Sequence, residues 1–351
     1  EDVSWARRCV SETVHIAPRI VFVALWVYVP VGSLFFGDLW RWLSPFETLA
    51  SFKDRRSTGG PSRGWSLNWA AVLMALFLWL ELAYHRPAGR TPLAVLLTFW
   101  VAWSGIGALW GGTEWLRSHD PLAAFTRLVA AMSPVHVHKG ALMVRKPLVG
   151  LGQVPIQKGL AALVLVVLGG TSFDGLSRTT WWAQIVGNRA GWNATVYNTI
   201  GLLFSMALIT ALFLGCVRWM QRRDGNTDRD FEDGFALSLV PVALGYAIAH
   251  YAGMAIFEGQ QLAVQLSDPL DRGWNLIGTA DTYVNYRIVG PTVIASIQAL
   301  GIVGGHLAGV MVGHDRTLTT LKNKDDVSGQ VPLVLLLASL TAIALLLLVE
   351  A

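Results

Sequence analysis

The sequence alternates long runs of apolar residues with shorter segments that carry most of the charge. Eight of these runs are 17 to 24 residues long, and about 20 apolar residues in a helix cross the ~30 Å hydrocarbon core of a bilayer. The runs lie at roughly 17–37, 65–84, 92–111, 159–175, 196–217, 235–257, 290–313 and 331–350. The pattern therefore predicts an all-α, polytopic membrane protein with about eight transmembrane helices, folded as one domain over residues 1–351.

Composition supports this prediction. Hydrophobic residues make up 53% of the 351-residue chain and charged residues only 14%, whereas a soluble domain has about 25% charged residues. The 16 Trp residues suit the bilayer interface, where indole rings are enriched. The net charge of +4 does not indicate nucleic-acid binding, because the basic residues lie in short loops between apolar runs. We therefore expect the lipid bilayer, and no nucleic acid, as a partner.

Lys and Arg residues give the predicted spans a direction. The loops after the first, third, fifth and seventh spans carry 18 of them, and the three alternate loops carry six. Cytoplasmic loops of membrane proteins are enriched in Lys and Arg. The distribution predicts a multi-pass protein of the plasma membrane with the basic loops in the cytoplasm and both ends of the sequence on the outer side.

Two of the predicted cytoplasmic loops resemble each other. After the first span, Ser44 precedes Pro45, and Glu47 completes a capping box. After the third span, Asp120 precedes Pro121, and a Trp comes shortly before the cap in both segments. We predict that each segment forms a short helix on the inner membrane surface. The likeness also suggests an internal repeat, as in many transporter folds, although chance similarity over so few residues is the alternative.

Ionisable side chains within or at the ends of spans are costly in a bilayer, so each is a candidate site residue. On the predicted orientation, six of them gather near the outer face, four on spans and two in the loop of about thirty residues before the seventh span. These residues are Glu81, Asp174, His250, Glu258, Asp268 and Asp281. For each residue alone, solvation at a span end or packing in the interior is the ordinary alternative. Gln298 lies at a similar depth in the seventh span.

Imidazole and carboxylate groups are the ligands that zinc takes in proteins, and zinc-bound water is nucleophilic near neutral pH. His250 and Glu258 are eight residues apart, which places them ~12 Å apart on a continuous helix. They bind one ion together only if that helix unwinds. A metal site that includes Asp174 must therefore be assembled from several spans.

The seventh predicted span contains a second feature, a row of small residues at four-residue spacing. The row consists of Gly301, Gly305, Gly309 and Gly313. Such a row allows two membrane helices to pack closely. His306 and His314 lie beside it and are candidate ligands for copper or haem. They are eight residues apart and point about 80° from each other, so they do not share one ion, and no histidine at matching depth completes a haem site.

Three stretches of the sequence resemble the actinobacterial multi-pass membrane proteins labelled fenitrothion hydrolase-like. The first stretch is Pro30–Gly37 with Trp40-Arg41 and Ser44-Pro45, and the second is Thr171–Ser177. The third runs from Ala249 to Asp315 and includes Ala249-His250-Tyr251, Glu258-Gly259-Gln260, Ser267–Leu270, Gly273–Asp281, Gly305-His306 and Gly313-His314-Asp315. The resemblance covers most of the chain. It implies hydrolysis of an organophosphate triester or a related ester, but it supplies no established catalytic residues.

Three functions follow as hypotheses. The first is a metal-dependent hydrolase of lipophilic esters at the outer leaflet, in which His250, Asp174 and Glu258 hold a divalent ion or its water and Asp268 or Asp281 assists. The second is a transporter or metal-handling permease, which requires a polar path between the outer cluster and His306 and His314. The third is a non-catalytic subunit of a respiratory or redox complex with other membrane subunits as partners.

Overall fold

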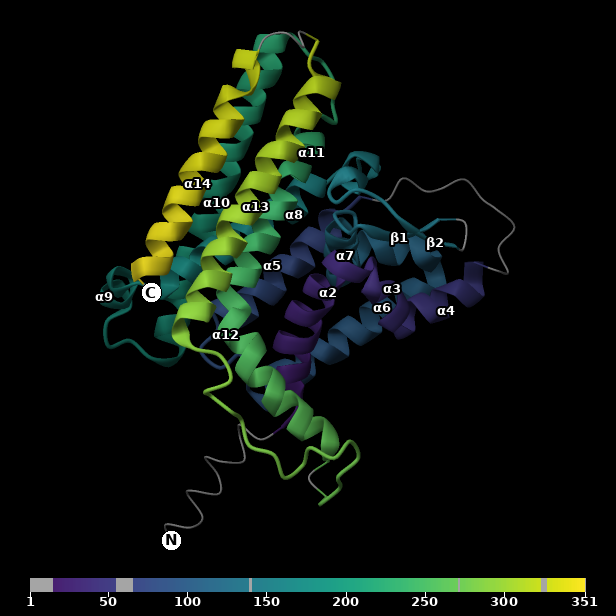
Figure 1. Ribbon diagram of the computed structural model, residues 1–351, viewed down its shortest axis with the longest axis vertical. Helices are drawn as coiled ribbons and strands as arrows, with labels where there is room; N and C mark the ends of the chain where they lie inside the picture. Colours follow the sequence, from purple (N-terminus) through teal and green to yellow (C-terminus); the bar gives the residue numbers. More distant parts are fainter. Residues whose placement is uncertain (1–14, 55–65, 139–140, 271, 323–326, 351) are drawn as a thin grey trace.

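The computed structural model describes residues 15–54, 66–138, 141–270, 272–322 and 327–350. Within these ranges the chain is helical apart from connecting loops and one antiparallel hairpin of two strands (Figure 1). Seven helical segments among the described residues are long and apolar enough to cross a membrane. The prediction of an all-α polytopic protein is confirmed, and the chain is an integral membrane protein in contact with lipid.

The membrane-spanning helices of the described residues, together with the shorter apolar helix α5, follow the order of the predicted spans. They are η1 (Arg19–Tyr28), a π-helix continued by α2 (Val29–Phe36), α5 (Asn68–Leu82), α6 (Arg90–His119), α8 (Leu160–Ser177), α10 (Gly191–Asp224), α12 (Val240–Ser267), α13 (Pro291–Thr320) and α14 (Val331–Glu350). The shorter elements are α3 (Leu39–Leu43), α4 (Pro45–Asp54), α7 (Pro121–Ala130), β1 (Val135–His138), β2 (Ala141–Val144), η2 (Val149–Gln153), α9 (Thr180–Val186), α11 (Phe231–Ala236), η3 (Leu237–Leu239) and η4 (Val327–Gln330).

Two helices differ from the predicted spans. Helix α5 has 15 residues and so measures about 22 Å, less than the hydrocarbon core of a bilayer. One face of it is buried, with Ala70 and Leu78 at 0% exposure, whereas Trp69 and Leu76 on the other face are exposed. Helix α12 continues ten residues beyond the predicted end of its span, passes through Gly259 and reaches Ser267.

The core of the molecule forms around α8. We compare the most apolar stretch of 18 residues in each membrane helix. In α8, 72% of this stretch is buried, whereas in α13 and in α14 only 17% is buried. Helix α8 packs between α5, α10 and α12, and its apolar side chains belong to the largest buried cluster. Helix α14 lies at the periphery beside α10 and α13 (Figure 1), so its almost purely apolar sequence faces lipid.

The predicted glycine row joins α13 to α12. A Cβ atom on Gly305 would lie 2.6 Å from the carbonyl oxygen of Pro241, and one on Gly301 would lie 2.9 Å from that of Gly245. Gly304, one residue away, has open space on its side. The two helix backbones therefore touch along this row, as the sequence predicts.

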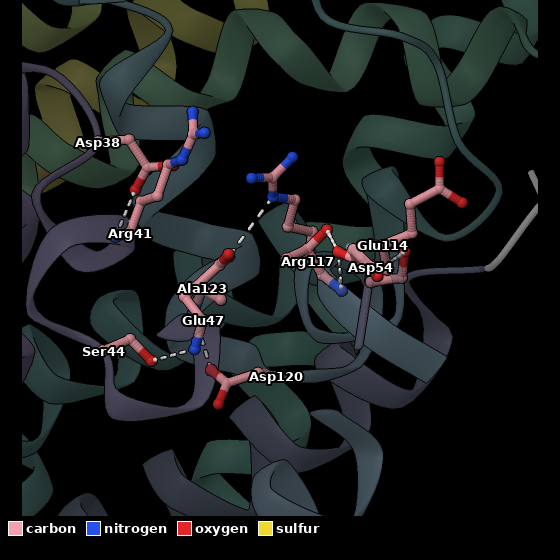
Figure 2. A network of polar contacts seen from close by, with 11 residues as sticks. Asp38, Arg41, Ser44, Glu47, Asp54, Glu114, Arg117, Asp120 and Ala123 are labelled. Atoms are coloured by element: carbon pink, nitrogen blue, oxygen red, sulfur yellow. Dashed lines mark hydrogen bonds and ion pairs between the residues drawn. The ribbon is translucent and has the colours of Figure 1, made fainter. Parts of the chain in front are cut away.

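The two similar loops have the same backbone. Gly37 after α2 has φ 80° and ψ −163°, and Gly112 within α6 has φ 74° and ψ −162°, a region open essentially to glycine alone. A short helical segment follows each glycine and ends at a capping residue. Ser44 Oγ accepts from the Glu47 amide at 3.4 Å, and Asp120 Oδ1 accepts from the Ala123 amide at 2.8 Å (Figure 2). The repeat seen in the sequence is therefore structural.

The two copies of this motif pack reciprocally. Helix α4, which follows the first copy, packs against α6, whereas α7, which follows the second copy, packs against α2 and α3. The prediction that both helices lie on the membrane surface is wrong for α7. Its residues Phe125, Leu128 and Val129 are buried, since α7 turns back into the core between α2, α5 and α6.

Candidate functional site

The central feature of the candidate site is a buried pair formed by Asp174 on α8 and His250 on α12. Asp174 Oδ2 lies 2.5 Å from His250 Nε2, and the two side chains are only 6% and 8% exposed. Arg178, one turn after Asp174, adds a positive charge. Its Nη2 atom lies 2.9 Å from His250 Nε2, and its Nε atom lies 3.7 Å from Asp174 Oδ1. The structure thus joins the predicted residues Asp174 and His250.

His250 Nε2 has two polar neighbours. It either donates a hydrogen bond to Asp174 or accepts one from Arg178, but one nitrogen does not do both. In the structure, Arg178 Nη2 has hydrogen-bond geometry to Nε2, whereas Asp174 Oδ2 is buried without a hydrogen-bond partner among the described residues. When Nε2 instead carries a hydrogen toward Asp174, the lone pair of the neutral ring lies on Nδ1.

A second polar pair borders the first. The Tyr251 hydroxyl donates to Glu81 Oε1 at 2.8 Å, and Glu81 Oε2 is buried without a hydrogen-bond partner among the described residues. The His250 ring meets Tyr251 edge-on at 4.7 Å and stacks on Tyr246 at 6.0 Å. Three helices, α5, α8 and α12, thus contribute to one buried polar group within the membrane domain.

Glu258 is not part of this group. It lies two turns beyond His250 on the same continuous helix, and its carboxylate binds Arg19 of η1 at 2.8 Å. The unwinding after Gly253 that would let His250 and Glu258 share an ion does not occur. The Glu258 side chain is 45% exposed, and its ion pair with Arg19 joins α12 to the first membrane segment.

The two acids of the loop between α12 and α13 also lie apart from the buried pair. Asp268 accepts the amides of Arg272 and Gly273 at 2.9 and 2.7 Å, so it caps a turn of its own loop. Asp281 is exposed, and within the described ranges it makes no hydrogen bond or ion pair. Gln298 is half-buried on α13 and forms no hydrogen bond with a described residue. The structure thus does not bring these three side chains to His250.

The two histidines of α13 occupy separate environments. His306 is 5% exposed; its Nδ1 atom contacts the carbonyl oxygen of Ile302 at 2.8 Å, and its Nε2 atom has no hydrogen-bond partner among the described residues. His314 is exposed and contacts Gln330 Oε1 at 2.8 Å. In the described part of the chain, neither histidine belongs to a group of three or more His, Cys, Asp or Glu side chains that could hold a metal ion.

The donor set does not fit a divalent ion. Within the described ranges, no three His, Cys, Asp or Glu side chains converge on one point. At the Asp174–His250 pair, His250 Nε2 is in contact with the cationic guanidinium of Arg178. A positive charge at this distance opposes the binding of a second cation. The zinc or copper ion predicted from the sequence thus finds no support in this geometry.

An apolar cavity of about 110 Å³ lies between η1, α5, α6 and the start of α7, and no residue of the polar group lines it. Its wall includes Phe77, one helical turn before Glu81 on α5, and Trp26, which packs edge-on against Phe77 at 5.0 Å. Trp26 and Tyr251 belong to the same buried cluster. The full lining is Val21, Leu25, Trp26, Leu73, Met74, Leu76, Phe77, Leu96, Leu97, Phe99, Trp100, Pro121 and Leu122. Such a cavity accepts a nonpolar group of a few carbon atoms.

Sequence reasoning did not identify three residues of the polar group, namely Arg178, Tyr246 and Tyr251. The sequence position of Arg178 could have indicated its role, because Arg178 lies four residues after Asp174 and therefore on the same helix face. Tyr246 and Tyr251 flank His250 in the sequence, but an aromatic residue in a membrane helix is ordinary and carries no such signal.

Comparison with known proteins does not assign the chain to a family. No family model, no curated protein and no solved structure matches it.

Proposed function

We propose that the chain is a membrane-embedded hydrolase of lipophilic esters, with its reaction centre at Asp174, Arg178 and His250. The main support for this proposal is the buried contact of 2.5 Å between Asp174 and His250, beside the Arg178 guanidinium. Burying the two ionisable groups Asp174 and His250 within a membrane domain costs free energy. A paired acid and base with an adjacent cation is the arrangement that general acid–base catalysis uses.

Each residue has a role in this proposal. Asp174 holds the His250 ring through Nε2–H, so that Nδ1 removes a proton from water as the water oxygen attacks the ester. The negative charge that develops on the ester oxygen is stabilised by Arg178, whose exposed guanidinium reaches toward solvent. The proton on His250 then passes to the departing alcohol or phenol, which restores the neutral ring. No step requires the metal ion predicted from the sequence.

The substrate class follows from the surroundings of the centre. An apolar cavity elsewhere in the membrane domain could hold a nonpolar group, and the resemblance to fenitrothion hydrolase-like proteins of actinobacteria favours an organophosphate-like ester. The basic loops favour an orientation in which this centre faces the outer leaflet of the plasma membrane and both chain ends lie outside. An ester dissolved in that leaflet would reach this centre without crossing the membrane.

The transporter hypothesis receives less support. It needs a polar path from His250 to His306, but α12 and α13 are in backbone contact between these levels at Gly245 and Gly301. The side chains of Ala249 and Ile302 pack into a buried apolar cluster at the same place. The hypothesis of a redox-complex subunit is tested by partners retained after mild purification and by a visible absorbance spectrum.

The test is hydrolysis by the purified protein in detergent micelles. The probes are a nitrophenyl carboxylate ester and a dialkyl nitrophenyl phosphate triester, and the readout is released nitrophenol. His250→Gln should lower kcat by about 10²- to 10⁴-fold, with little change in KM. His85→Gln is the matched control, because His85 contacts Thr195 outside the centre. If the folded protein hydrolyses neither ester, or if His250→Gln retains the full rate, the proposal fails.

A further inference from the structure

A cluster of charged residues lies where the two repeated motifs meet, at the end of the membrane domain opposite the ester-hydrolysis centre. All three arginines of the cluster, Arg41, Arg117 and Arg127, act electrostatically on the carboxylate of Asp38. Arg117 and Arg127 also act on Glu47. Three cations thus face two carboxylates, and burial raises the pKa of both carboxyl groups, since it disfavours their charged forms.

The internal repeat explains why the arginines converge. Arg41 lies three residues before the capping residue Ser44, and Arg117 lies three residues before the capping residue Asp120. Reciprocal packing of the two motifs brings these equivalent positions together. Figure 2 shows the guanidinium groups of Arg41 and Arg117 turned to the same side of the cluster, with Glu47 beneath them.

Much of the hydrogen-bonding capacity of these arginines is unused. A guanidinium has five N–H donors. Arg117 uses Nε for Glu47 at 3.4 Å, and the side chains of Arg41 and Arg127 donate no hydrogen bond to any residue that the structure describes. Asp38 is already engaged, because it accepts the backbone amide of Arg41 at 3.2 Å. The cluster therefore offers several donors and one unbalanced positive charge.

The surroundings of the cluster indicate a lipid surface. The cluster lies at the ends of the membrane helices α2 and α6, where headgroups meet the hydrocarbon core. Large aromatic side chains beside it are exposed: Phe36 is 68%, Trp42 is 70% and Trp110 is 59% exposed. Exposed Trp and Phe at the end of a membrane helix are typical of the bilayer interface.

We infer that Arg41, Arg117 and Arg127 form a binding site for a phosphodiester, supplied by the headgroup of an anionic lipid in the adjoining leaflet. Arginine donates two parallel hydrogen bonds to phosphate oxygens. A phosphodiester carries one negative charge, which balances the single excess positive charge of the cluster. The exposed aromatic side chains would contact the glycerol and the upper acyl chains of the same lipid.

The test uses the whole protein in detergent micelles, titrated with phosphatidylglycerol, phosphatidylcholine or inorganic phosphate. Tryptophan fluorescence reports binding, because Trp40 and Trp42 border Arg41. Phosphatidylglycerol should bind saturably and more tightly than phosphatidylcholine, whose choline cancels the phosphate charge. Arg41→Gln should weaken the binding about tenfold, since a charge-assisted contact is lost. Arg41 is exposed, so this variant is expected to fold.

Arg222→Gln is the matched control, because Arg222 is an exposed arginine of another basic loop, outside the cluster. Its affinity for phosphatidylglycerol should stay close to that of the wild type. Inorganic phosphate that binds with the same dependence on Arg41, without competition from lipid, would support phosphate recognition and overturn the lipid source. If no probe binds saturably, or if Arg222→Gln weakens binding as much as Arg41→Gln, the inference is overturned.

Discussion

Replacing Gly305 by alanine tests the close contact between α12 and α13. The new Cβ would lie 2.6 Å from the Pro241 carbonyl oxygen and 2.9 Å from Gly245 Cα, whereas non-bonded carbon atoms prefer about 3.5–4.0 Å. Both neighbours are backbone atoms, so relief requires the helices to move apart by about 1 Å. Overpacking of this kind costs about 1–3 kcal/mol.

Gly304→Ala provides the reference, because a Cβ at Gly304 meets nothing within 4 Å. Both variants replace glycine in the same helix, so the gain in helix propensity of about 1 kcal/mol cancels between them. The free energy of unfolding of Gly305→Ala should therefore lie about 1–3 kcal/mol below that of Gly304→Ala. Thermal and denaturant unfolding in one detergent, followed by circular dichroism, measure the difference. Equal stabilities, or a less stable Gly304→Ala, would refute the packing argument.

Asp120→Ala should lower the free energy of unfolding by on the order of 3 kcal/mol, because it removes the cap of α7 and leaves the buried donors of Trp100 and Ser104 unpaired. The exposed Asp281→Ala should change thermal stability by less than about 0.5 kcal/mol. Burial raises the pKa of Glu47, so its folded form binds a proton more tightly than its unfolded form. The stability of the wild type relative to Glu47→Gln should therefore be greatest in acid and fall as the pH rises from about 4 toward 7, in a series of melting curves. A flat difference would contradict the assigned burial effect.

Local patterns predicted the fold well because each depends on a few neighbouring residues. A run of about 20 apolar residues is stable in lipid as a helix wherever its neighbours lie, so the order of the spans follows from hydropathy. A Ser or Asp before Pro marks a helix start, and both predicted caps, Ser44 and Asp120, are present. Four-residue spacing placed the glycines of α13 on one face, and that face is the contact surface.

The candidate site was predicted only in part, because hydropathy gives depth in the membrane but not rotation about a helix axis. Asp174 and His250 were assigned similar depths, and the structure joins them. Glu258 was assigned to the same region, yet its side chain reaches Arg19, which is 239 residues away in the sequence. Asp268 and Asp281 share the predicted side of the membrane, but their loop has hydrogen bonds of its own and keeps them apart from His250.

The sequence by itself determined that this chain is a helical membrane protein, where its apolar segments lie, and which residues begin its short helices. Those properties depend on burial in lipid and on hydrogen bonds between residues close in the chain. Only the tertiary structure decided which ionisable groups meet, that α7 turns into the core, and that Arg41 and Arg117 converge. Those outcomes depend on how whole helices pack, and packing brings together side chains whose separation in the sequence carries no signal.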